Sequence, residues 1–270
     1  MLKTRWSCTF DLNISPCLAF ATRYKFRYTT EMEKPKRHVL GVVFDGDDTL
    51  WSTEQLYDDA RLSARDVVAV SGLDPERWEE LERRIDVENV AKLGYSPKRF
   101  PTSCVQAYEE LCRSEWRDPD THVVRQIRLA ASSVFTSDPP VMLGARETLA
   151  RLRACGIRLG LLTKGNREVQ QRRIANSGLS DLFDVIQIVP EKTPATILKI
   201  VSVLGVDVRS AWMVGNSVRS DILPALAAGL QAVWINAHVW EYERACDHDV
   251  DSRVISISKL TDISEVIAND

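Results

Sequence analysis

The first strongly apolar run of the chain covers residues 38–44 (HVLGVVF), and Asp45, Asp47 and Asp48 follow it directly. The run is short and rich in β-branched residues, which is typical of a buried strand in a parallel sheet. Because it stops at a cluster of acids, we expect this strand to end at a functional edge of the sheet. The pattern therefore predicts a strand over His38–Phe44.

The spacing of apolar positions becomes helical after Trp51 and stays so for nearly 90 residues. Residues such as Val67, Trp78 and Tyr108 belong to apolar positions that recur every three or four residues among charges. Turn-forming sequences interrupt this pattern at 72–75, 94–97 and 118–119, and a final one at 138–140 closes it. We therefore predict an inserted helical bundle.

Strands and helices alternate over the rest of the chain. Helices are predicted from Arg146 to Ala154 and from about Asn166 to Asn176. The predicted strands, in chain order, are Ile157–Leu162, Val185–Val189, Ala211–Val214, Ala232–Ile235 and Val254–Ile257. Such alternation is typical of an open, doubly wound parallel sheet that helices cover on both faces. Ligands of these sheets bind outside the carboxyl ends of the strands.

Composition and charge exclude several classes of partner. The 270 residues are enough for a well-buried core. The 35 basic and 38 acidic residues give a net charge of -3, and no basic block suggests binding to nucleic acid or to an anionic membrane. No apolar run approaches the ~20 residues that a membrane span needs. We expect neither a nucleic acid nor a membrane as partner, and the oligomeric state stays open.

Residues 1–36 differ in character, since they are basic and show no clear period. We interpret them as a poorly ordered extension, with Met32 as an alternative start. A secretory signal that ends near Ala19-Phe20-Ala21 and an organelle transit peptide are the alternatives. The six cysteines are scattered and lack zinc-ligand spacing, which is typical of reduced thiols. We therefore predict a cytoplasmic protein.

The segment Asp45-Gly46-Asp47-Asp48-Thr49 holds the first candidate chemistry. Alternate carboxylates that leave a strand end point into one shared space, where they repel each other. A magnesium ion together with an incoming phosphate resolves that repulsion. The structural alternative is an acidic turn in which Asp48 or Thr49 caps the next helix.

Three further segments follow predicted strands at the same edge. Thr163 carries a hydroxyl that suits a phosphoryl oxygen, and the backbone amides of Lys164 and Gly165 lie beside it. Lys192 is a point charge that suits phosphate. The turn from 215 to 221 contains Asn216 and Asp221, which suit a hard cation. Each of these signals is weak by itself, because a strand-end threonine, a solvated lysine and a capped helix start are common.

The order Asp-x-Asp-x-Thr, Thr, Lys and Gly-Asn-x-x-x-x-Asp resembles the four motifs of the haloacid dehalogenase-like superfamily. The resemblance covers essentially everything from His38 to the end. It implies a Rossmann-like core over 37–52 and 139–270. The helical bundle over 53–138, between the first and second motifs, is similar to the cap of one subgroup of this superfamily.

The resemblance also implies roles for the motif residues. Asp45 is expected to attack phosphorus and Asp47 to act as general acid and base. Thr163, Lys164, Gly165 and Lys192 are expected to hold the phosphoryl oxygens. A magnesium ion is expected on Asp45, the backbone carbonyl of Asp47 and Asp221, with Asn216 holding a metal-bound water. The expected function is a Mg²⁺-dependent phosphatase that acts on a small phosphorylated metabolite.

Four alternatives stay open beside this expectation. Asn216 stands where the superfamily usually has an acid, so a binding protein with an impaired site is one alternative. A phosphomutase is a second. A dehalogenase is disfavoured because Asp47 is retained, and a receiver-type signalling domain is disfavoured because its phosphorylated Asp follows the third strand.

Trp51, Lys98 and Arg99 are candidate substrate contacts, although hinge packing of Trp51 and solvation of the two cations are the simpler interpretations.

Overall fold

The computed structural model describes residues 39–236 and 254–268. Within these two ranges, six parallel strands form one sheet in the order β3-β2-β1-β4-β5-β6. The strands are β1 (Gly41–Phe44), β2 (Arg158–Lys164), β3 (Val185–Val189), β4 (Ala211–Gly215), β5 (Gln231–Ile235) and β6 (Val254–Ile257). The predicted α/β parallel sheet is confirmed. The predicted start at His38 lies outside the described residues.

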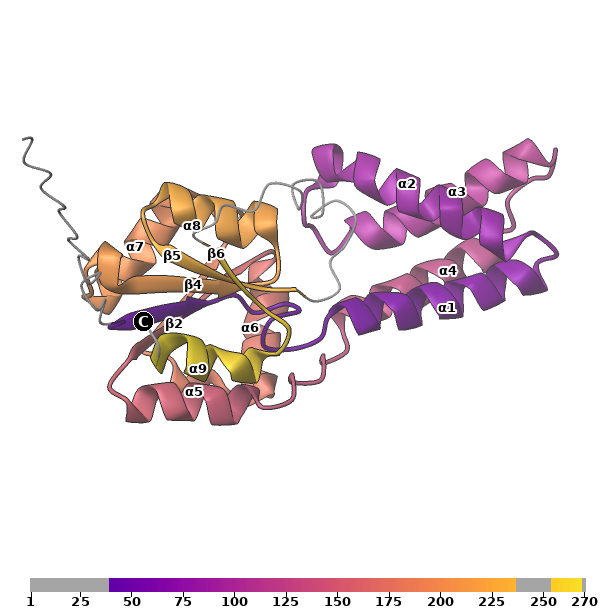
Figure 1. The fold of residues 1–270 in the computed structure, drawn as a ribbon. Coiled ribbons are helices and arrows are strands. Elements are labelled where there is room, and N and C mark those ends of the chain that lie inside the picture. The colour runs from indigo at the N-terminus through magenta and orange to yellow at the C-terminus, as the bar shows by residue number, and fades with distance from the viewer. Residues whose placement is uncertain (1–38, 237–253, 269–270) are drawn as a thin grey trace, which may run out of the picture. The chain divides into compact units, whose positions relative to one another are not determined.

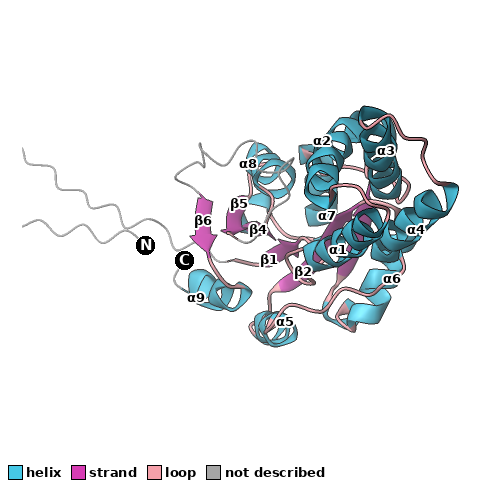
Figure 2. Cartoon of the chain, turned by 90° about the vertical axis from the view of Figure 1, so that its right-hand side faces the viewer, coloured by secondary structure: helices cyan, strands magenta, loops and turns pink. Residues whose placement is uncertain are grey.

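Alternation of side chains along the strands divides the core into two layers. Val42 and Phe44 belong to a core cluster with residues of α5 (Ala145–Ala154) and α9 (Ile263–Ala268), whereas Val43 belongs to a second cluster with residues of α7 (Pro194–Leu204) and α8 (Leu223–Ala227). Both faces of the sheet are therefore buried, which explains why β1 reads as a continuous apolar run. Figures 1 and 2 show these helices on opposite sides of the sheet.

The segment between β1 and α5 forms four α-helices. These are α1 (Glu54–Val70), α2 (Pro75–Leu93), α3 (Arg99–Ser114) and α4 (Thr121–Ser132), followed by the short 3₁₀-helix η1 (Ser133–Phe135). The helices enclose an apolar cluster of their own, which contains Trp78, Phe100 and Leu111. Their ends match the turn signals in the sequence. We call α1–α4 and η1 the insert (Figure 1).

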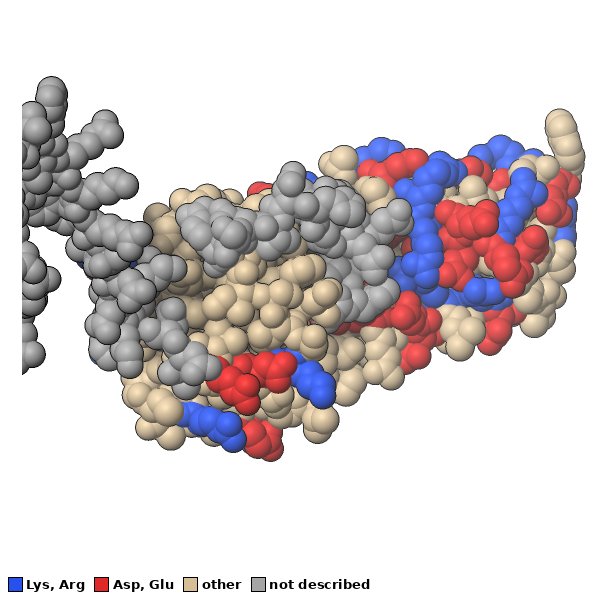
Figure 3. All heavy atoms as spheres, viewed as in Figure 1, with Lys and Arg blue, Asp and Glu red and all other residues tan. Residues whose placement is uncertain are grey.

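The surface of the insert carries charges of both signs. On the face that Figure 3 shows, Lys and Arg side chains are mixed with Asp and Glu side chains over these helices. Within the described ranges, no helix is long and apolar enough to cross a membrane.

The order of the strands places a switch point between β1 and β4. Chain connections leave in opposite directions on its two sides, so a crevice opens at the carboxyl ends of these two strands. Helix α6 (Arg167–Ser177) begins directly after β2, at the same edge of the sheet. This edge therefore receives the chain segments that carry the candidate motifs.

Candidate active site

Asp45 follows β1 directly and is 6% exposed. The Lys192 Nζ atom donates a hydrogen bond to Asp45 Oδ1 and another, of 2.6 Å, to Asp221 Oδ1. Thr49 Oγ1 donates to Asp45 Oδ2 over 3.4 Å. Three residues that are far apart in the sequence thus meet at the switch point, with one ammonium group between two carboxylates.

Charge in this cluster is unbalanced. Burial raises the pKa of Asp45 to about 7, and the nearby negative charge of Asp221 adds to the rise, while Lys192 opposes it. Burial by itself would lower the pKa of Lys192, but Asp221 and Asp45 together raise it above its ordinary value. The cluster therefore holds a firmly protonated lysine and two carboxyl groups that compete for it.

The loop after β4 fixes Asp221. Ser217 donates its backbone N–H to Asp221 Oδ2 over 3.0 Å, and Thr49 Oγ1 donates to Asn216 Oδ1 over 3.5 Å. A Cβ atom at Gly215 would collide with the Asp221 carboxylate, so this position requires glycine. Asn216, Asp221 and Asp45 are all buried at one point. Their oxygens are of the kind that bind a hard cation.

Asp47 points toward a different set of partners. Trp51 donates its indole N–H to Asp47 Oδ1 over 2.7 Å. Gln170 Nε2 and Arg173 Nη1 donate to Asp47 Oδ2 over 2.8 and 3.0 Å. The Trp51 side chain is fully buried, so this tryptophan both packs at the start of the insert and holds Asp47.

The neighbouring Asp48 is a structural residue. It has a positive φ of 59° and accepts hydrogen bonds from the Thr53 and Glu54 backbone N–H groups over 2.8 and 2.9 Å. Burial raises its pKa to about 6, against the effect of these hydrogen bonds. The helix-capping interpretation is thus confirmed for Asp48, which accepts from two backbone N–H groups at the start of α1.

Thr163 and Lys164 end β2 beside the aspartates. Thr163 is 1% exposed, and its Oγ1 atom has no hydrogen-bond partner among the described residues. Lys164 Nζ donates to Ser220 Oγ over 2.6 Å and to the Tyr95 hydroxyl over 3.1 Å. A buried hydroxyl without a partner is costly, so Thr163 favours a ligand that accepts its hydrogen bond.

These residues line a cavity of about 150 Å³. Its walls include Asp45, Asp47, Thr163, Lys192 and Asp221 from the sheet edge, and Glu54, Tyr57, Arg61, Asp86, Tyr95 and Arg99 from the insert. Lys164, Gly165 and Asn216 also line it. The sheet edge and the insert therefore share one cavity.

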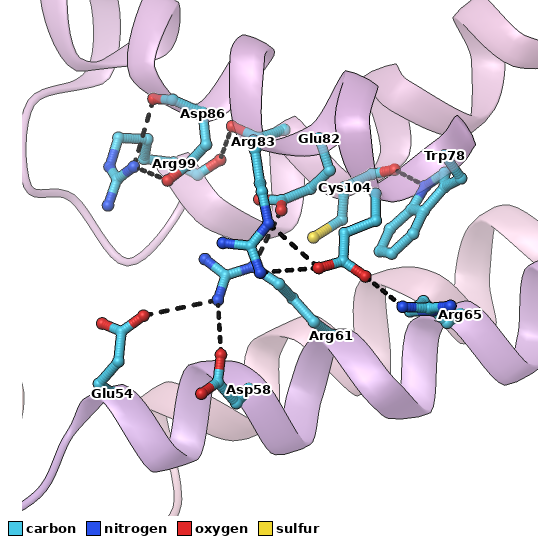
Figure 4. A network of polar contacts seen from close by, with 12 residues as sticks. Glu54, Asp58, Arg61, Arg65, Trp78, Glu82, Arg83, Asp86, Arg99 and Cys104 are labelled. Carbon is cyan, nitrogen blue, oxygen red and sulfur yellow. Dashed lines mark hydrogen bonds and ion pairs between the residues drawn. The ribbon is translucent and has the colours of Figure 1, made fainter. Parts of the chain in front are cut away.

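Arg99 is not solvated, contrary to the simpler interpretation of the sequence. It is 5% exposed and pairs with Asp86, whereas solvation was expected. The reason is its place as the first residue of α3, where the Asp86 carboxylate of α2 draws the guanidinium between the helices (Figure 4). Lys98, one residue earlier, is exposed and does not line the cavity.

Three residues that line the cavity, Gln170, Arg173 and Arg61, were not predicted from the sequence. Gln170 and Arg173 lie three apart on α6, so they share a face of that helix. That spacing, directly after the second motif, is the signal that would have found them. Arg61 lies in α1 and pairs with Glu82, 21 residues later, which no local pattern indicates.

The possible metal donors are oxygens from different residue types. Among the described residues, no group of three or more His, Cys, Asp or Glu side chains is arranged to hold a metal ion. The expected set instead combines the carboxylates of Asp45 and Asp221, the amide oxygen of Asn216 and the backbone carbonyl of Asp47. Hard-cation sites use such mixed oxygen donors.

The protein is an α/β enzyme whose sheet is parallel. At the switch point of the sheet, a lysine lies between two buried aspartates in an acidic crevice. The profile of the haloacid dehalogenase-like hydrolase family matches residues 39–229. The chain belongs to this family.

Two curated relatives and one solved structure are informative. A glyceraldehyde 3-phosphate phosphatase of Pyrococcus abyssi is 27% identical over 221 residues, which are 73% of this chain and 90% of the relative. Hexitol phosphatase B of Escherichia coli K12 is 25% identical and covers 87% of this chain and 97% of its own. A crystal structure of a haloacid dehalogenase-like family hydrolase from Xanthomonas campestris superposes with a TM-score of 0.69 at 26% identity, over 86% of this chain and 96% of that one.

Proposed function

We propose that the protein is a Mg²⁺-dependent phosphatase that hydrolyses a small phosphorylated metabolite through an aspartyl-phosphate on Asp45. The observation that carries the proposal is the meeting of Asp45, Lys192 and Asp221 at the carboxyl ends of three strands. The names of the relatives, which are phosphatases of glyceraldehyde 3-phosphate and of hexitol phosphates, support the same chemistry.

In the proposed reaction the Asp45 carboxylate attacks phosphorus, and the bond from phosphorus to the leaving oxygen breaks. Asp47 gives its proton to the leaving oxygen and then takes one from the water that hydrolyses the aspartyl-phosphate. Lys192 and the Thr163 hydroxyl hold the phosphoryl oxygens, together with the backbone amide of Lys164. Fixed donors of this kind stabilise the charge that develops on phosphorus in the transition state. The Gly165 N–H, which the sequence suggested as a further donor, instead donates to the Val189 carbonyl over 3.0 Å.

The residues fit a magnesium ion. Two buried carboxylates share one lysine. Burial and then the nearby charge of Asp221 raise the pKa of Asp45, so a further cation would relieve the repulsion. Asp45, Asp221, the carbonyl of Asp47 and Asn216, through water, would hold it. When bound, Mg²⁺ supplies positive charge beside the phosphoryl oxygens.

The insert is proposed as the part that selects the substrate. Residues 53–138 would close over the cavity and exclude water. Arg99 is the best-placed candidate for the leaving group, because it is buried and lines the cavity. Trp51 contributes through Asp47, and Lys98 is the weakest candidate because it lies outside the cavity lining. The small cavity supports a substrate of metabolite size.

One alternative has a specific observation in its favour. Asn216 brings an amide where a third side-chain carboxylate would strengthen the cation site, so a phosphate-binding protein with weak catalysis is the second candidate. A phosphomutase shares every step up to the aspartyl-phosphate. The retained Asp47 disfavours a dehalogenase, which needs no proton donor there.

The proposed location is the cytoplasm. The described cysteines Cys104, Cys112 and Cys155 are free thiols, which agrees with a reducing compartment.

The test is a substrate panel with purified protein. p-Nitrophenyl phosphate, glyceraldehyde 3-phosphate, hexitol phosphates and phosphoglycolate are assayed with Mg²⁺ and with chelator, beside Asp45→Asn. The proposal expects Mg²⁺-dependent release of phosphate that Asp45→Asn abolishes. Folded protein that binds inorganic phosphate but releases none from any substrate would favour the binding protein instead.

A further inference from the structure

Helix α6 holds the Asp47 carboxylate through two buried side chains. Gln170 and Arg173 are 3% and 4% exposed, and both donate to Asp47 Oδ2. Gln170 Nε2 also donates to the Lys164 carbonyl over 3.1 Å, which ties this contact to the end of β2. With Trp51 on the other carboxylate oxygen, both oxygens of Asp47 are engaged. Its orientation is therefore set by Trp51 of its own loop and by two side chains of α6.

Arg173 has a second contact, with the segment that leads out of the insert. Its Nη2 atom donates to the Val134 carbonyl in η1 over 3.2 Å. The neighbouring Arg172 contacts the same segment further on, with Nη2 donating to the Ser137 carbonyl over 3.3 Å and Nε 3.4 Å from Asp138. We call residues 133–138 the return segment. Arg172 contacts the return segment, whereas Arg173 contacts both the return segment and Asp47.

The chemistry of arginine suits this double contact. A guanidinium group presents its N–H donors in a rigid plane, so two acceptors that it binds are held in fixed relation. The Arg173 side chain is 4% exposed and that of Asp47 is 29% exposed. Separating the pair would leave the buried guanidinium uncompensated, so the contact also resists rearrangement. A shift of the return segment would therefore displace the guanidinium and, with it, the Asp47 carboxylate.

We propose that Arg173 is a positioning residue that orients the Asp47 carboxylate for proton transfer while the return segment of the insert is docked on α6. The position of the insert thereby reaches the proton-transfer group through one side chain. This inference rests on the proposed function, in which Asp47 exchanges a proton with the leaving oxygen.

A comparison of substrates with different leaving groups distinguishes a positioning role of Arg173 from a merely structural one. An alkyl phosphate releases a strongly basic oxygen that needs a proton as the bond breaks, whereas p-nitrophenolate leaves readily without one. General acid catalysis contributes about 10²–10⁴-fold where it is needed. Because kcat/KM reports the steps up to release of the leaving group, a misplaced Asp47 lowers kcat/KM for the alkyl substrate far more than for the aryl substrate.

The experiment measures kcat/KM of Arg173→Met on p-nitrophenyl phosphate and on the best alkyl phosphate of the panel. We expect a loss of about 10²-fold on the alkyl substrate and of less than about tenfold on the aryl substrate. Arg173→Lys keeps the positive charge but not the planar set of N–H donors, so we expect it to retain part of the activity on the alkyl substrate. The matched control, Arg172→Met, loses a return-segment contact but none to Asp47, and it keeps the wild-type ratio between the two substrates.

Equal losses on both substrates, or no loss, would overturn the inference. If Arg173→Met does not fold, Arg173→Lys decides, and a wild-type ratio of the two kcat/KM values in that variant would contradict the positioning role. Wild-type protein without Asp45-dependent turnover would overturn the proposed function, and the inference with it. Wild-type turnover with a uniform loss in the variants would overturn the inference and leave the proposed function standing.

Discussion

Two clusters of buried charge border the cavity, and they differ in balance. At the sheet edge, Asp45 and Asp221 share Lys192. In the insert, Arg61 pairs with Glu82 and Arg99 pairs with Asp86 (Figure 4). The first cluster has more acids than bases, whereas each arginine of the second has its own buried acid.

The difference separates a cluster with an excess of acid from one in which each arginine is matched by a buried acid. The pKa of Asp45 is about 7 because of burial and then the charge of Asp221. The pKa of Glu82 is also about 7, but there burial acts against the attraction of Arg61. Burial is therefore the largest cause of both raised pKa values. The clusters differ in the next influence, because Asp221 adds to the rise at Asp45 whereas Arg61 opposes it at Glu82. We expect changes at the sheet edge to act on catalysis and changes in the insert to act first on stability.

The largest expected effect comes from breaking the insert cluster with Arg61→Met. The change leaves Glu82 buried without its close partner, and we expect a loss of about 3–5 kcal/mol in the free energy of unfolding. Urea denaturation measures it. The control is Arg65→Met, one turn later on α1, where the side chain is 30% exposed and pairs with Glu76 and Glu79. Such a pair contributes about 0–1 kcal/mol, so equal losses in the two variants would contradict the comparison.

Lys192→Met tests the sheet edge. We expect kcat to fall about 10²–10³-fold, as when one fixed donor to the transition state is removed. Steady-state kinetics on p-nitrophenyl phosphate measures this loss. Lys199→Met, on the exposed side of α7, is the control and should keep wild-type kcat. Full activity of Lys192→Met would show that the lysine is structural.

The pH dependence of stability sharpens the contrast. Because the folded pKa of Glu82 is raised from 4.5 to about 7, its protonated form stabilises the native state, and this contribution is lost as pH rises between these values. The loss is on the order of 3 kcal/mol. We expect Glu82→Gln to flatten the fall in stability over this range, measured by urea denaturation at several pH values.

Glu79→Gln is the control for that experiment. Glu79 lies one turn earlier on α2, and arginine contacts lower its pKa against a raising effect of burial. Its titration therefore falls below the range in question. An unchanged slope in Glu82→Gln, or an equal change in both variants, would refute the assignment to Glu82.

The smallest expected effect is that of Asn216→Asp. A third side-chain carboxylate raises the negative charge around the expected cation, so we predict about threefold tighter Mg²⁺ binding. Both the Mg²⁺ dependence of kcat and the Mg²⁺-induced rise in Tm measure it. A weaker response of Tm to Mg²⁺ in this variant would place the ion elsewhere.

The strands and the insert were predictable because their signals are local. Each strand is a short apolar run that ends at turn or polar residues, and the helical spacing of 54–132 is interrupted where the helices end. The candidate residues at the strand ends were predictable for the same reason, since the carboxyl ends of parallel strands meet at one edge.

The partners of these residues were not predictable from local pattern. Arg173 meets Asp47 over a separation of 126 residues, and Lys192 meets Asp45 over 147. The burial of Arg99 depends on Asp86 in another helix. Such contacts follow from the packing of whole elements, whereas periodicity reports a residue's own element.

The most direct test of the central claim is to trap the phosphorylated enzyme. Wild-type protein is mixed with p-nitrophenyl phosphate and Mg²⁺, quenched in acid, and digested for mass spectrometry. The account predicts one added phosphoryl group on the peptide that contains Asp45, and none in Asp45→Asn. A phosphoryl group on another residue, or rapid turnover by Asp45→Asn, would contradict it.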